Sequence, residues 1–159
     1  MLAVIGSDDF LYKLVFLLHI LSAIVAFAPA FVWPIVNMQT RKRGATVPAE
    51  VAGQVPVNNV IVHGPAMVAT GIFGLLMVIM SNESAVTGEK VFEFSQAWVS
   101  GAFLVWFALL GVMFGLLVPA ERKAAAGDAD AAKKVGMFGG FVHILLLVML
   151  ILMIWKPGL

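Results

Sequence analysis

Residues 136–155 read GMFGGFVHILLLVMLILMIW, an uninterrupted apolar run in which His143 is the only titratable side chain. At a rise of 1.5 Å per residue, about 20 apolar residues cross the roughly 30 Å hydrocarbon core of a bilayer. The run therefore predicts a transmembrane helix. Three further stretches meet the same condition of length and composition, residues 10–38, 59–80 and 96–119. The chain is thus expected to cross a membrane four times.

The composition indicates one membrane-embedded domain over residues 1–159. Hydrophobic residues make up 62% of the chain and charged residues 12%, and the mean hydropathy is +1.02. So few polar side chains could not cover the surface of a soluble globule. We therefore expect an all-α, four-helix up-down bundle with the lipid bilayer as its surroundings. The net charge of +1 argues against nucleic acid as a partner.

The basic residues are concentrated at one end of the predicted bundle. Loops rich in Lys and Arg remain on the cytoplasmic side of a membrane, so both termini are predicted to lie outside. A cleaved signal peptide is the alternative for the first apolar run. Asp8 and Asp9 argue against it, because a signal peptide needs basic residues there. The predicted orientation rests on the seven of ten basic residues that lie at this end: Arg41, Lys42, Arg43, Arg122, Lys123, Lys133 and Lys134.

Three of the four spans contain one histidine each: His19, His63 and His143. An ionisable side chain within a span indicates a functional site, because hydrocarbon offers its ring no hydrogen-bond partner. Each histidine shares a helical face with small residues, which are typical of helix contacts in membranes. We therefore expect the three imidazoles to face the interior. The small residues are Ser22, Ala23, Ala26 and Ala30; Ala66, Thr70, Gly71 and Gly74; Gly136, Gly139 and Gly140; and, on the third span, Gly101, Ala108, Gly111 and Gly115.

These histidines are the candidate cofactor ligands. Two imidazoles facing each other would hold haem b, with neighbouring glycines admitting the macrocycle. Copper(I) prefers softer ligands, and its candidate set is His63, Met67 and His143. His143 lies at an intermediate depth and could pair with either His19 or His63. In the alternative without a cofactor, each imidazole only forms a hydrogen bond to a nearby side chain, as His19 could with Ser22 and His63 with Thr70.

Other chemistry is excluded by what the sequence lacks. With no cysteine, the chain forms no disulfide, thiolate metal site or catalytic thiol. No acidic residue lies within the predicted spans, which argues against a proton relay and against most hydrolytic mechanisms. Nothing in the pattern therefore predicts an enzyme acting on its own.

Short motifs along the whole chain carry a family resemblance. They are Leu17 to Ile24 (LLHILSAI), Thr70-Gly71, Trp98, Pro119 with Arg122, and the WKPG of residues 155–158. They resemble a group of small bacterial integral membrane proteins of unknown function that is distantly similar to copper-resistance protein D and to the haem-associated membrane protoporphyrinogen oxidase. The resemblance implies a bacterial cytoplasmic membrane and makes His19 a candidate haem or metal contact. Residues 26–30 (AFAPA) replace the family's glycine-rich stretch, so the oxidase activity is not carried over.

Two functions from different classes remain open. The first is a haem- or copper-binding protein for redox or metal handling that uses the buried histidines. The second is a non-catalytic accessory subunit, whose small-residue stripes pack against other membrane subunits, for example of a respiratory complex, or in a homo-oligomer.

Overall fold

The computed structural model describes residues 10–81 and 90–157 of the chain, and this part is helical without a β-strand. Four continuous helices of 33, 31, 29 and 27 residues are long and apolar enough to cross a membrane, which confirms the predicted multi-pass class. Two of them are built from shorter elements joined by a π-helical turn, η1 or η2. The elements are α1 (Phe10–Lys42), α2 (Ala49–Asn58), η1 (Asn59–His63), α3 (Gly64–Ile79), α4 (Ala97–Val112), η2 (Met113–Leu117), α5 (Val118–Ala125) and α6 (Ala129–Trp155).

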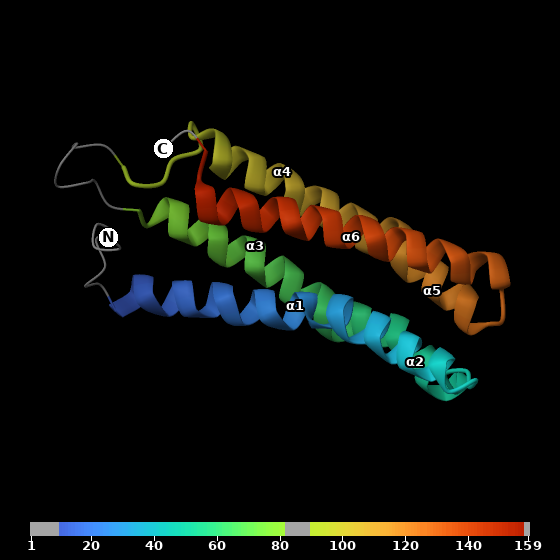
Figure 1. Ribbon diagram of the computed structural model, residues 1–159. Coiled ribbons are helices and arrows are strands. Elements are labelled where there is room, and N and C mark those ends of the chain that lie inside the picture. Colours follow the sequence, from blue (N-terminus) through green and yellow to red (C-terminus); the bar gives the residue numbers. More distant parts are fainter. Residues whose placement is uncertain (1–9, 82–89, 158–159) are drawn as a thin grey trace.

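The helices alternate in direction, as predicted for an up-down bundle (Figure 1). α1 packs along α3, and α4 packs along α6. The two hairpins meet where α3 contacts α4, where α2 contacts α5 and where α6 contacts α1. The start of α1 and the end of α6 therefore lie at the same end of the bundle, opposite the connections after α1 and α5.

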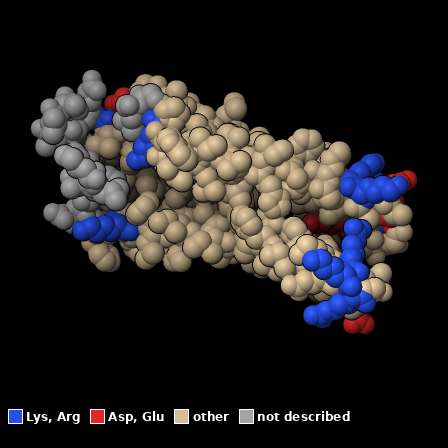
Figure 2. Space-filling view, viewed as in Figure 1, with Lys and Arg blue, Asp and Glu red and all other residues tan. Residues whose placement is uncertain are grey.

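On the face that Figure 2 shows, the charged side chains lie at the two ends of the bundle and the surface between them is uncharged. Large side chains stand exposed along its length, such as Ile24 at 61%, Leu104 at 73% and Ile144 at 59%. In water such a continuous surface would drive aggregation, whereas in a bilayer it contacts lipid. The interior is narrow and is centred on Leu109, which is fully buried. A lipid bilayer is therefore the environment that suits this surface.

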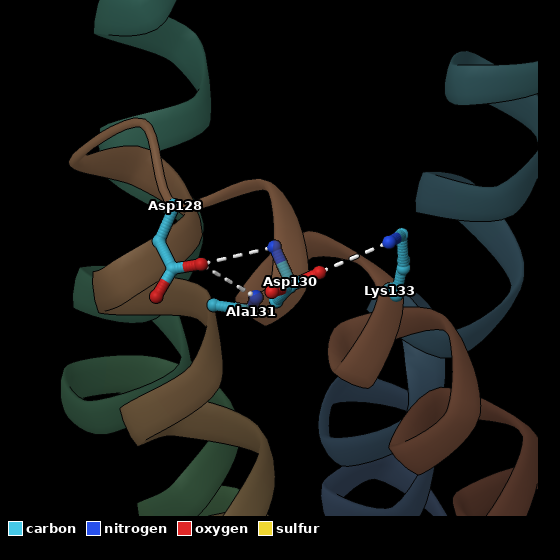
Figure 3. A network of polar contacts seen from close by, with 4 residues as sticks. All are labelled: Asp128, Asp130, Ala131 and Lys133. Carbon is cyan, nitrogen blue, oxygen red and sulfur yellow. Dashed lines mark hydrogen bonds and ion pairs between the residues drawn. The ribbon is translucent and has the colours of Figure 1, made fainter.

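The helices at the basic end extend beyond the predicted spans. The sequence predicts a loop or a short interfacial helix over residues 39–58; in the structure α1 continues to Lys42, and the next helix begins at Ala49. The connection expected over residues 121–135 shrinks to residues 126–128, between α5 and α6. Figure 3 shows why α6 begins there: the Asp128 carboxylate accepts hydrogen bonds from the Asp130 and Ala131 amides at 2.9 and 3.0 Å. The bond from Ala131 is the main reason that the pKa of Asp128 lies below its usual value.

Two prolines explain the π-helical turns. Pro65 and Pro119 follow η1 and η2 at the second position of α3 and α5, and neither can donate a backbone hydrogen bond. The amides just before them bond five residues back instead, Gly64 to the Asn59 carbonyl and Val118 to the Met113 carbonyl. π-helical turns of this kind recur at functional sites. Here they shift the register of two neighbouring helices at similar depth.

The prediction about small residues holds for the second span and is wrong for most of the third, where only Gly101 of the four faces a neighbouring helix. A Cβ on Gly71 would collide with the indole of Trp106, and one on Gly74 would lie 3.3 Å from Cε1 of His19. On α4 and η2, by contrast, Gly111 and Gly115 are exposed, with no neighbouring atom within 4 Å of a Cβ. Large side chains, including Leu109, form the interior face of the third span instead. Packing there is therefore set by side-chain volume.

A candidate ligand cavity lined by His143

A cavity of about 400 Å³ lies between the two hairpins, toward the end that carries most basic residues. This volume falls within the range of small-molecule sites. Glycines on α6 leave the space unfilled on one side, and the alanines and prolines of α1 leave it unfilled on the other. The lining comprises Ala26, Phe27, Pro29, Ala30, Trp33, Pro34 and Asn37 of α1; Asn59 and Met67; Met113, Leu117 and Glu121; and Val135, Gly136, Gly139, Gly140, Val142 and His143 of α6.

His143 is the only histidine in this lining. Its Nδ1 lies 2.7 Å from the carbonyl oxygen of Gly139, and its ring meets Phe31 edge to face at 5.8 Å between centroids. Because a carbonyl can only accept, Nδ1 is the donor in this hydrogen bond, and Nε2 is the ring nitrogen left to contact a ligand. A histidine held in this way is already in the tautomer and orientation that a metal ligand needs.

Two methionines share the cavity with His143. Met67 and Met113 are 2% and 4% exposed, and both line the space. The backbone of Met67 is held in place by Trp106, whose Nε1 donates to the Met67 carbonyl at 2.9 Å. A thioether is a soft ligand, so the residues that line the cavity include one imidazole and two thioether side chains. Of the predicted metal set, the cavity thus unites Met67 and His143 and leaves out His63.

His19 and His63 both bond across the contact between the first two spans. Nδ1 of His19 donates to the Thr70 carbonyl at 2.9 Å, and Nδ1 of His63 donates to the Val25 carbonyl at 2.7 Å. The Ser22 hydroxyl bonds the backbone carbonyl of His19 and also accepts from Thr70 Oγ1, at 3.0 Å each. These bonds tie α1 to α3. A cofactor role for His19 and His63 stays a prediction.

Sequence reasoning missed a buried carboxylate at the same cavity. Nδ2 of Asn59 donates to both oxygens of Glu121, at 2.9 and 2.7 Å, and the two residues are 4% and 9% exposed. The third span was predicted to end at Pro119, and Glu121 was assigned to the connection over residues 121–135, which could extend the helix by a few turns but was not expected to be buried. Proline is tolerated in the first turn of a helix, and α5 continues through it. Counting at 3.6 residues per turn could not have placed Glu121 on the interior face, because the π-helical turn η2 shifts the helical register just before it.

Titratable groups do not otherwise converge in the bundle. Over residues 10–81 and 90–157, no three His, Asp or Glu side chains lie close enough together to hold a metal ion. A metal at this cavity would therefore depend on the imidazole of His143 together with thioether sulfur.

No protein-family model, curated protein or solved structure matches the chain. The fold places the chain among multi-pass helical membrane proteins, and a fold alone does not specify a function. The function is therefore argued from the cavity.

Proposed function

We propose that the protein binds a metal cofactor, copper or haem b, in this cavity, with Nε2 of His143 as the principal ligand. One observation carries the proposal. His143 lines the cavity with Nδ1 bonded to Gly139, so that Nε2 is the free donor atom, and Met67 and Met113 line the same space. The family resemblance to copper- and haem-associated membrane proteins agrees with this choice.

Each of the two cofactors is favoured by one feature of the cavity. Copper(I) is favoured by one imidazole with two thioethers, a soft ligand set. Haem b is favoured by Gly136, Gly139 and Gly140, where a Cβ would meet no atom within 4 Å and a flat ring can approach the helix. His143 together with a methionine of the lining would then hold the haem, a ligand combination that some cytochromes use.

The orientation belongs to the same proposal. The basic clusters at one end of Figure 2 flank the cavity end of the bundle, so the positive-inside rule places the cavity toward the cytoplasm. Both termini then lie outside. By the family resemblance, the membrane is the bacterial cytoplasmic membrane.

Cysteine labelling tests this orientation on a chain that has no cysteine of its own. Ala45→Cys and Ala126→Cys lie in exposed connections at the basic end, and Ser95→Cys is exposed at the other end. In intact cells an impermeant maleimide should label only Ser95→Cys, and the other two should react only after the membrane is opened. The reverse pattern would contradict the orientation.

Elemental and optical analysis of the purified protein tests cofactor binding. The protein is isolated in detergent with an affinity tag free of histidine, and a blank purification from cells lacking it serves as the control. We expect close to one copper atom per chain, or one haem with a Soret band and sharp α and β bands after dithionite. If neither is present, even after incubation with copper(I) or haem, the proposal is wrong. Migration within a larger membrane complex would then support the accessory-subunit function.

A further inference from the structure

The buried carboxylate of Glu121 has no cationic partner. It accepts from Asn59 at both oxygens, which is the pattern of an ionised carboxylate, and it is 9% exposed. In the described ranges, 10–81 and 90–157, no lysine or arginine forms an ion pair with it. A buried charge without a partner is costly, and proteins normally compensate it with an opposite charge.

Glu121 belongs to the wall of the cavity, and most of the other lining residues are apolar. Figure 2 shows acidic atoms recessed between the basic clusters at this end of the bundle, whereas the basic side chains extend outward. The neighbouring Arg122 and Lys123 are exposed on α5. The missing positive charge is therefore one that a bound ligand could supply.

We infer that Glu121 makes the cavity selective for a soft monovalent cation, of the class of copper(I) and silver(I), over haem. This inference rests on the proposed function, and it names the ligand class of the same site. His143, Met67 and Met113 supply soft donors, while Glu121 balances the charge that the cation brings into an apolar space. Haem carries two propionates, and placing them beside an unpaired carboxylate adds repulsion.

Asn59 positions the carboxylate for this role. Both hydrogen bonds to the Glu121 carboxylate come from the single amide nitrogen of Asn59, so the carboxylate is held against η1. Each carboxylate oxygen can accept a further bond, so both can still interact with a ligand. Asn59 begins η1, so the π-helical turn sets where the amide lies. Glu121 is thus fixed between the hairpins, and its charge acts on whatever enters the cavity.

The test compares three variants with the wild-type protein in the same detergent. Glu121→Gln removes the charge but keeps the shape, and Glu121→Asp keeps the charge. Glu50→Gln is the matched control, because it removes the same charge from an exposed position on α2. Copper(I) affinity is measured by competition with a chromogenic chelator, silver(I) affinity by calorimetry, and haem uptake by absorbance. Thermal unfolding of each variant shows whether it folds.

We expect Glu121→Gln to bind both cations about tenfold more weakly, equivalent to about 1.4 kcal/mol, and to take up more haem than the wild type. Glu121→Asp should recover most of the cation affinity, and Glu50→Gln should match the wild type. Equal cation affinity in Glu121→Gln and the wild type, or haem uptake by the wild type in preference to copper(I), would overturn this inference and leave the proposed function standing. A wild-type protein that binds none of the three probes would overturn both. If Glu121→Gln does not fold, the selectivity of the wild type decides: preference for copper(I) over haem supports the inference, and the reverse preference overturns it.

Discussion

His143→Ala is expected to lower metal affinity by about a hundredfold or more, because it removes the one imidazole that lines the cavity. The alanine variant leaves Met67 and Met113 without a nitrogen ligand, and a haem form would lose its axial ligand and change spin state or dissociate. Bound metal is quantified after equilibration at fixed free metal. Met67→Leu and Met113→Leu nearly conserve volume and should each have a smaller effect.

His63→Ala is the matched control, since it makes the same substitution at a histidine outside the cavity lining. Its metal affinity should stay within about threefold of the wild type, because its hydrogen bond to Val25 serves the helix contact. If His63→Ala lost as much metal as His143→Ala, the bound metal would be shared between two helices as the sequence first suggested. The geometric assignment of the site would then be wrong.

The second large effect concerns stability. Gly71→Ala should destabilise the protein by about 1–3 kcal/mol, because the added methyl group would overlap the indole of Trp106 at the contact between α3 and α4. The indole cannot move freely, since its Nε1 donates to the Met67 carbonyl at 2.9 Å. Thermal unfolding in detergent, followed by circular dichroism, measures the loss.

Gly111→Ala provides the control for Gly71→Ala. It makes the same change on α4 where no atom lies within 4 Å, and it should leave stability unchanged or slightly raised. Gly71→Ala combined with Trp106→Leu should lose less stability than the sum of the two single changes, because the clash is removed. Additive losses, or equal stability of the two glycine variants, would show that α3 and α4 do not meet as described.

Much of the fold follows from patterns that act over short distances. Apolar length alone located four spans, because every backbone group in a bilayer must be paired within its own helix. Basic residues such as Arg41 and Lys134 marked one end of the bundle, and the structure places the end of α1 and the start of α6 at that same end (Figure 1). Gly71 and Gly74 were correctly placed on a contact face, since both lie on a regular helix that packs closely against a neighbour.

The rest depends on features that no short pattern carries. A helical extension beyond Pro119 could be anticipated from the sequence, but the burial of Glu121 on α5 could not. The π-helical turns η1 and η2 change the helical register, so faces counted at 3.6 residues per turn do not pass through them unchanged. The grouping of Met113 with Met67 and His143 arises only when two hairpins meet. Sequence periodicity describes one helix at a time and could not show it.

X-ray absorption spectroscopy, recorded at the absorption edge of the bound metal, tests the central claim most directly. The wild-type protein, loaded to one metal per chain, should show imidazole nitrogen and sulfur in the first coordination shell. His143→Ala, loaded at higher metal concentration, should lose the imidazole signal and keep the sulfur signal. A wild-type shell without imidazole, or one that is identical in His143→Ala, would contradict the assignment of this cavity as the metal site.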